Sequence, residues 1–491
     1  MIQIYLHQLL DYALKQSLLD LVDAEYAINR LLRLFDLDSF ECAQYEDELD
    51  FHVLLERLLD YATFKGLIDQ EGFMRDHFEA QMMDCFLPRP SELNRLFREQ
   101  YKKGPLTATT YFYRLSQATN YIKTERIKNN IAFVYNGKYT PLQITINLSK
   151  PEKDPKLIAQ LAKTTSNHYP KCALCMENVG FYGTLEKAPR SNHRVVDLTI
   201  NHEKNAWGLQ YSPYAYFNEH CIILKKDHIP MKVDDNTLDE LVDFVNQFPH
   251  YLIGSNAGLP IVGGSILDHY HFQGGRHRFP IFDAPVKRLW KKRGLEFAIL
   301  DWPMSVIRIS SNSENKLLDY AKDVFHAWQL YDNPEIGIHE KTLEPHNTIT
   351  PILYLEGSIY HMLLVLRNNY SSEERPYGHF HPREAYFNIK KENIGLIEVM
   401  GLAILPGRLK RELELIQEVL MGKSSIEEHP ELKKHQEWVV SFQDIPHDAD
   451  QIQDYLKQQV GAVFEHVLED CAVFGPQHQE AFYRFVEQAI G

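Results

Sequence analysis

The segment Gly263–Gly275, with the sequence GGSILDHYHFQGG, concentrates the side chains best suited to chemistry. Alternate side chains of a β-strand share a face, so a strand here would place His269, His271 and Gln273 on one face. The two aromatic side chains between them would pack on the other face. Two imidazoles and a carboxamide on one face are costly to bury without polar partners. The glycine pairs at both ends leave backbone amides open to phosphate oxygens.

These residue types suit the transfer of a group that contains phosphorus. A neutral imidazole can attack phosphorus without prior deprotonation, provided that an acceptor holds its second nitrogen. The amide of Gln273 could donate to a phosphoryl oxygen as the charge shifts. The alternative is a pair of structural histidines on a half-exposed strand, and the H-x-H pattern alone favours it. The added carboxamide and glycine pairs favour a catalytic site.

The surrounding sequence predicts the elements that position this segment. Apolar residues recur at helical spacing up to about residue 130, and strand-like runs alternate with helical runs from about 170 to 400. Asn136-Gly137 lies between two alternating runs and predicts a β-hairpin. Residues 151–155 have the composition of a linker. Helical periodicity returns at 406–422 and 449–490. We therefore expect an α+β core between a helical N-terminal domain and a helical C-terminal tail.

A division into four parts follows from these changes of pattern. The parts are a mainly helical domain at 1–150, a first catalytic half at 151–290, a second half at 291–405 and a helical region at 406–491. The run Glu219–Leu224 resembles Tyr360–Val365, and each is followed by a polar turn. The two halves could thus be duplicates, although two unrelated apolar strands would look equally similar.

Composition excludes several classes of protein. The chain has 491 residues and a formal net charge of -15, whereas a general nucleic-acid binder needs clustered basic residues. No run of about 18 apolar residues predicts a membrane span. The start of the chain lacks the pattern of a signal peptide. Six cysteines in so long a chain do not indicate a disulfide scaffold. We expect a cytoplasmic protein that binds neither nucleic acid nor membrane.

The run His269–Gln273 resembles the active-site strand of the galactose-1-phosphate uridylyltransferases, in the histidine-triad superfamily. The longer runs Ser255–Ser265, Glu344–Pro351, Tyr169–Asn178 and Asn388–Ile397 are similar to the second, Gram-positive class of that family. The resemblance spans most of the chain. It implies a histidine-triad-like antiparallel sheet and the exchange of a uridylyl group between glucose 1-phosphate and galactose 1-phosphate, with UDP-glucose and UDP-galactose as partners. No organic cofactor is implied, and a homodimer is compatible with it.

Roles for single residues follow from the same resemblance. It makes His271 the nucleophile and Gln273 the amide that binds the phosphate. Asn256, Gly264 and Ser265 match positions near the substrate phosphates, and His346 and Asn347 could line the sugar end of the pocket. Two rival functions stay open, a phosphorylase or hydrolase of dinucleotides or nucleotide sugars and a nucleotide-binding regulator without catalysis.

Cys172 and Cys175 form a C-x-x-C pattern, which is typical of a structural zinc site or of two ordinary buried thiols. The first class of the related enzymes carries such a pair and two later histidines in the same order. That resemblance makes His228 and His269 the remaining ligands of a structural zinc. His379 and His381 would again share one face of a strand, and a second metal near them stays open.

Overall fold

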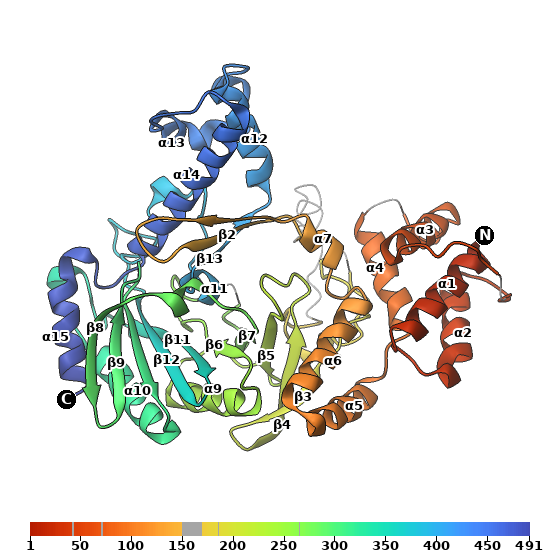
Figure 1. The fold of residues 1–491 in the computed structure, drawn as a ribbon, viewed down its shortest axis with the longest axis horizontal. Coiled ribbons are helices and arrows are strands. Elements are labelled where there is room, and N and C mark those ends of the chain that lie inside the picture. Colours follow the sequence, from red (N-terminus) through yellow and green to blue (C-terminus); the bar gives the residue numbers. More distant parts are fainter. Residues whose placement is uncertain (42–43, 70–71, 150–168, 185, 265) are drawn as a thin grey trace. The chain divides into compact units, whose positions relative to one another are not determined.

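The computed structural model describes residues 1–41, 44–69, 72–149, 169–184, 186–264 and 266–491. The chain divides into two compact units, and each is described by itself (Figure 1). The first comprises residues 1–128, 151–215 and 221–228, and the second comprises 129–150, 216–220 and 229–491. The linker expected at 151–155 lies outside the described residues. The four-part division proposed from the sequence stays a prediction.

The N-terminal part of the first unit is helical, as the apolar spacing predicts. Pro105 stands at the first position of helix α6, where its missing amide hydrogen costs no hydrogen bond. Gly104 links that helix to the one before it with φ 144°, a backbone conformation that favours glycine. The helices are α1 (Ile2–Lys15), α2 (Ala24–Leu34), α3 (Phe51–Phe64), α4 (Gly72–Asp84), α5 (Pro90–Lys103), α6 (Pro105–Ala118) and α7 (Thr124–Lys128).

Three antiparallel strands complete the first unit, namely β3 (Val196–Ile200), β4 (Glu203–Tyr211) and β5 (Cys221–Lys225). Helix α5 packs against β3. The Asn94 side chain of α5 accepts a hydrogen bond from the backbone amide of Asp197 at 2.7 Å. The helices and the strands of this unit therefore share direct polar contacts.

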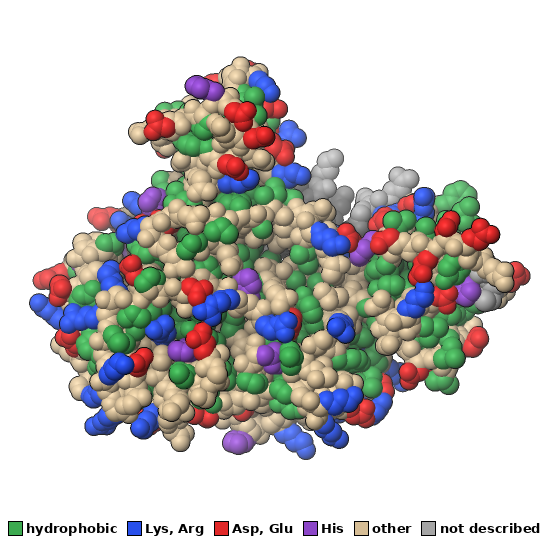
Figure 2. Space-filling model, in the orientation of Figure 1, with side chains coloured by type: hydrophobic (Ala, Val, Ile, Leu, Met, Phe, Trp, Pro, Cys, Tyr) green, Lys and Arg blue, Asp and Glu red, His purple; other side chains and the backbone are tan. Residues whose placement is uncertain are grey.

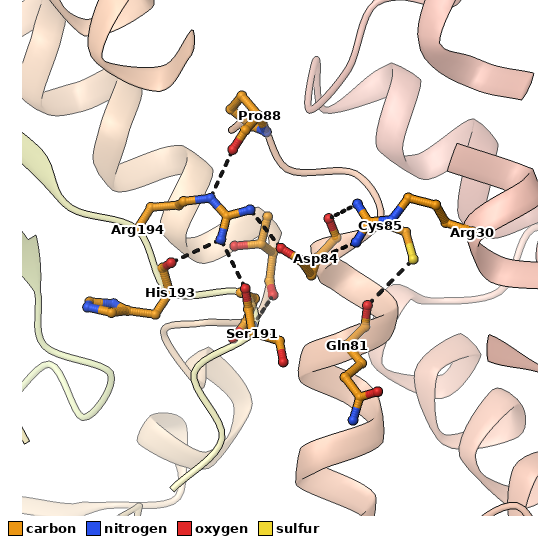
Figure 3. A network of polar contacts seen from close by, with 10 residues as sticks. Arg30, Gln81, Asp84, Cys85, Pro88, Ser191, His193 and Arg194 are labelled. Atoms are coloured by element: carbon orange, nitrogen blue, oxygen red, sulfur yellow. Dashed lines mark hydrogen bonds and ion pairs between the residues drawn. The ribbon is translucent and has the colours of Figure 1, made fainter. Parts of the chain in front are cut away.

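A partly buried ion-pair network joins the helices to the segment before β3 (Figure 3). Asp84, at the end of α4, accepts hydrogen bonds from Arg194 and from Arg30, each at 2.6 Å. The Arg194 guanidinium also donates to the carbonyl oxygens of Pro88 and Ser191, each at 2.9 Å. Because so many acceptors converge on it, the buried arginine is held in one orientation.

The second unit is built on antiparallel strands in the order β7-β6-β11-β12-β10-β9-β8. Gln273 of β7 pairs with Gly254 of β6, and Gly254 pairs in turn with Ile352 of β11. The strands are β6 (Leu252–Gly254), β7 (His271–Gly275), β8 (Val286–Lys292), β9 (Leu295–Leu300), β10 (Val306–Ser311), β11 (Asn347–Glu356) and β12 (Ile359–Asn368).

Two helices, α9 (Asp235–Gln247) and α10 (Glu314–Gln329), pack on these strands and on each other (Figure 1). Asp234 begins α9 with a capping box, in which its carboxylate accepts from the Thr237 amide at 3.1 Å. This local signal marks the start of α9, which lies in the region where the sequence predicts that helical and strand-like runs alternate.

A second, three-stranded sheet belongs to the same unit. The predicted hairpin is confirmed, since β1 (Ile131–Tyr135) and β2 (Leu142–Asn147) pair antiparallel, and β13 (Leu402–Pro406) joins β2 in parallel. The helix α14 packs on β1 and β2. The C-terminal helices are α11 (Leu396–Val399), α12 (Arg408–Leu420), α13 (Gln436–Val440), α14 (Ala449–Asp470) and α15 (Gln479–Ala489). The expected α+β fold is confirmed, with largely antiparallel strands that follow helices in the chain and are followed by further helices.

Surface charges are mixed on the face drawn in Figure 2, where basic and acidic side chains alternate. Among the described residues, no helix is both long enough and apolar enough to cross a membrane.

Candidate active site

His271 is the first residue of β7, and its imidazole is held by the backbone. Its Nδ1 lies 2.7 Å from the carbonyl oxygen of His269. A carbonyl oxygen only accepts, so Nδ1 carries the hydrogen and Nε2 keeps its lone pair. Burial lowers the pKa of His271 to about 4. The ring is therefore neutral near pH 7, with one nitrogen free to act as a nucleophile.

The strand is shorter than the sequence predicts. It begins at His271, and His269 lies in the bend before it. Tyr270 and Phe272 are both buried, as expected. The hydroxyl of Tyr270 donates to a Glu240 carboxylate oxygen of α9 at 2.6 Å. The segment before the strand is thus fixed by this side-chain anchor to α9 and by two backbone hydrogen bonds, from the Tyr270 amide to the Ile229 carbonyl oxygen at 2.7 Å and from the Met231 amide to the Leu267 carbonyl oxygen at 2.8 Å.

Gln273 follows His271 on β7 at the spacing that places both on one face. Its side-chain oxygen Oε1 lies 3.1 Å from Nε2 of His220. Because that oxygen only accepts, the imidazole donates. The carboxamide nitrogen of Gln273 has no hydrogen-bond partner within the described part of the chain.

The polar side chain of Asn256 is packed between two backbone segments. Its Oδ1 accepts from the amide of Leu396 at 2.9 Å. A Cβ atom on Gly264 would lie 2.5 Å from Nδ2 of Asn256, so any larger residue there would displace the Asn256 side chain. Asn256 and Gly264 are therefore neighbours, and two residues that bind the same ligand must lie close together in this way. Ser265 lies outside the described residues.

His346 and Asn347 make internal hydrogen bonds. Nδ1 of His346 lies 2.8 Å from Oδ1 of Asn369, and its Nε2 lies 2.8 Å from the Thr342 hydroxyl. The amide of Asn347 donates to the carbonyl oxygens of Trp328 and Tyr331. These contacts give both side chains a structural role, and their role at the sugar end of a pocket stays a prediction.

Among the described residues, one group of side chains could hold a metal ion, namely Cys172, Cys175, His228 and His269. Their ligand atoms all lie within 4.8 Å of one another. The two sulfur atoms are 3.5 Å apart, and Sγ of Cys175 lies 3.1 Å from Nδ1 of His228. Ligands of a tetrahedral zinc would lie roughly 3.3–3.8 Å apart, given bonds of about 2.0–2.3 Å. The donor set and its spacing therefore fit a tetrahedral metal site.

His379 and His381 do not lie on a strand, and the expectation that they share a strand face is wrong. They sit in turns and bends. Nε2 of His379 lies 3.0 Å from the Ser372 hydroxyl, and Nε2 of His381 lies 3.2 Å from Oδ1 of Asn393. Neither histidine belongs to the metal-type group found in the described residues.

His220 is the residue at this site that the sequence did not single out. It stands just before the apolar run of β5, and the sequence offered it only as part of a possible duplication. Its contact with Gln273 joins positions 53 residues apart, so no local pattern could reveal it. The one sequence feature that indicates a role for His220 is its position directly before an apolar strand, where a histidine is unusual.

An α+β chain with an oriented, neutral imidazole beside a carboxamide on one strand is suited to an enzyme that uses a histidine as its nucleophile. Residues 17–230 match the family model described as "Galactose-1-phosphate uridyl transferase, N-terminal domain". Proteins named galactose-1-phosphate uridylyltransferase are similar along the whole chain. The one from Caldanaerobacter subterraneus is 45% identical, covering 99% of this chain and 97% of its own. The one from Bacillus subtilis is 40% identical, covering 99% and 97%. The chain belongs to the galactose-1-phosphate uridylyltransferase family.

A similar solved structure is that of yeast Ap4A phosphorylase Apa2 in complex with AMP. It has a TM-score of 0.36 and 13% sequence identity, covering 68% of this chain and 94% of that one.

Proposed function

We propose that the chain is a UDP-glucose:hexose-1-phosphate uridylyltransferase with His271 as its nucleophile. The family relationship supports the substrates UDP-glucose, galactose 1-phosphate, UDP-galactose and glucose 1-phosphate. The observation that carries the role of His271 is the hydrogen bond from its Nδ1 to the His269 carbonyl oxygen, at 2.7 Å. This bond leaves the Nε2 lone pair free for attack on phosphorus.

The reaction runs in two displacements. Nε2 of His271 attacks the α-phosphorus of UDP-glucose, the new P–N bond forms, and the P–O bond to glucose 1-phosphate breaks. A phosphate oxygen of galactose 1-phosphate then attacks the same phosphorus, and the P–N bond breaks as UDP-galactose forms. Gln273 binds a phosphoryl oxygen through its amide, and Asn256 and Gly264 contact the phosphates. The third residue that the resemblance places near the phosphates, Ser265, lies outside the described residues. Exclusion of water protects the intermediate.

Enzyme given UDP-glucose alone tests this mechanism. It should release about one glucose 1-phosphate per active site and then stop, because the uridylyl group stays on the protein. Intact mass should show the gain of one uridylyl group, labile to acid, and galactose 1-phosphate should discharge it as UDP-galactose.

The variant His271→Gly should gain no adduct, whereas His447→Gly, the same change at an exposed histidine in a loop, should gain it normally. Intersecting initial-rate lines with neither burst nor adduct would mean direct transfer in a ternary complex, and the role of His271 would be wrong.

We further propose that the metal of the Cys172, Cys175, His228 and His269 group is zinc. Two thiolates and two imidazoles are the donors of closed structural zinc sites, where the ion braces the fold and does no chemistry. Elemental analysis of protein purified without chelator should give one zinc per chain. Cys175→Ser should lower that content, whereas Cys221→Ser, at a buried cysteine outside the group, should not. Wild-type protein without zinc would exclude the proposal.

A further inference from the structure

The imidazole of His220 and the carboxamide of Gln273 form a hydrogen-bonded pair in the second unit. His220 is 2% exposed, and its ring contacts Phe217, with centroids 4.4 Å apart. Its Nε2 lies 3.1 Å from Oε1 of Gln273. A buried hydrogen bond between two neutral side chains contributes little to stability in itself, so its effect on orientation is the more informative property.

The backbone brings this pair together with unusual closeness. A Cβ atom on Gly275 would lie 2.6 Å from the carbonyl oxygen of Glu219, so glycine alone lets β7 approach the segment before β5 so closely. Two hydrogen bonds clamp the segments, from the Arg276 amide to the Asn218 carbonyl at 3.1 Å and from the Asn218 side chain to the Arg276 carbonyl at 3.0 Å. His220 is therefore held at a fixed position beside the strand.

The carboxylate of Glu219, the residue before His220, is held as well. It accepts from the Tyr251 hydroxyl at 2.6 Å and pairs with Arg276 at 3.3 Å. Tyr251 directly precedes β6 and Arg276 directly follows β7, so these contacts hold the turn in place, and the imidazole cannot follow Gln273 if the carboxamide rotates.

The proton on the His220 ring decides which way the carboxamide points. Nδ1 of His220 is buried and has no hydrogen-bond partner among the residues that the structure describes. With the hydrogen on Nε2, that orphan atom is a bare lone pair. With the hydrogen on Nδ1, it would be a buried N–H without an acceptor, which is the rarer and costlier arrangement in proteins. The first tautomer makes Nε2 the donor and Oε1 of Gln273 the acceptor, so the amide NH₂ points away from His220.

We propose that His220 is a positioning residue that locks the Gln273 carboxamide with its NH₂ group toward the transferred phosphoryl group. The proposal rests on the proposed function, in which Gln273 donates to a phosphoryl oxygen. Without His220, the carboxamide can rotate about its last torsion and present its oxygen to the phosphate, where it repels. A donor fixed beforehand stabilises developing charge without reorganisation, so the lock should act on kcat.

A double-mutant cycle tests this role. His220→Phe removes the donor but keeps an aromatic ring against Phe217. It should lower kcat roughly three- to tenfold, which corresponds to the net free energy of one neutral hydrogen bond, and it should change KM little. Gln273→Ala should lower kcat by about a hundredfold or more, as loss of a transition-state donor does. Adding His220→Phe to Gln273→Ala should lower kcat no further.

Two variants separate positioning from a merely structural effect. His220→Gln retains a side-chain N–H donor and should recover part of the kcat lost in His220→Phe. His277→Phe is the matched control, because Nε2 of His277 makes the same kind of bond, 2.8 Å from Oε1 of Gln143, a glutamine outside the proposed site. That variant should keep the wild-type kcat. Melting temperatures measured for all variants report on folding.

Each outcome decides between the hypotheses. A Gln273→Ala variant with normal kcat would refute the role of Gln273 in the proposed function, and the role of His220 with it. A weakened Gln273→Ala beside a fully active His220→Phe would leave the proposed function intact and overturn the positioning role. Losses that multiply in the double variant would mean that His220 acts independently of Gln273, which also overturns it.

Discussion

Replacing Asp84 with asparagine should destabilise the first unit by about 3 kcal/mol. The side chain of Arg194 is 8% exposed, and its Nη2 donates to Asp84 at 2.6 Å. Arg194 is also tied to the backbone carbonyls of Pro88, Ser191 and His193 (Figure 3). It therefore cannot swing into water when the countercharge is removed. Breaking a buried pair in this way costs about 3–5 kcal/mol, and asparagine retains one acceptor oxygen, which places the value at the lower end.

Hydrogen exchange of the α4 amides measures this loss locally, without requiring that the two units unfold together. A loss of 3 kcal/mol should reduce the protection of the slowest amides by about 100-fold. Adding Arg194→Met should restore part of it, because the unpaired buried charge is gone. The control is Glu99→Gln, which breaks the exposed pair of Glu99 with Arg95, worth about 0–1 kcal/mol. If the α4 amides of Asp84→Asn were as well protected from hydrogen exchange as those of the control, the buried charge of Arg194 would not need Asp84, and the prediction would be wrong.

Two further predictions concern the second unit. Burial alone would raise the pKa of Glu412, but hydrogen bonds from His435 and Lys434 and the charge of Arg408 outweigh it and lower that pKa to about 2. The ionised carboxylate of Glu412 should contribute on the order of 2–3 kcal/mol to the free energy of unfolding, in full above pH 4.5 and less as the pH falls toward 2. Urea unfolding measures this free energy for wild type and for Glu412→Gln across the same window, and the two values should converge at low pH. His271→Gly should abolish uridylyl transfer yet change the free energy of unfolding by only about 1 kcal/mol, because Phe272 supplies the burial of β7. An inactive variant that is also unfolded by circular dichroism would leave His271 with a structural role.

Local signals made much of the fold predictable. The β1–β2 hairpin and α9 each carry their own pattern, alternation in one case and an apolar helical face with a capping box in the other. The start of β7 could not be predicted in this way. Ile261 has a positive φ of 73° in a turn, and His269 lies in a bend just before the strand. An H-x-H pattern has the period of a strand whether or not a neighbouring strand pairs with it.

The strand-like period of an H-x-H pattern also explains why the sequence wrongly predicts a strand at His379 and His381. Their spacing mimics a strand, but Gly378 with φ 113° and Pro382 interrupt any ladder, and each imidazole finds a side-chain partner instead. Pairs such as His220 and Gln273 are harder still, because the order of strands in the sheet decides which distant residues meet. Residue type could indicate the chemistry, but only the assembled sheet supplies the partners.

His269 has two separate tasks, and this affects how its variants are interpreted. Its side chain belongs to the metal-type group, while its carbonyl oxygen accepts the Nδ1 hydrogen of His271. Replacing its side chain removes a metal donor but keeps the carbonyl, so any loss of activity must pass through displacement of the backbone. A lower activity of the His269 variant should therefore be accompanied by a lower free energy of unfolding. The lower activity of His271→Gly should not. Comparing the two variants separates a residue that positions the proposed nucleophile from that nucleophile itself.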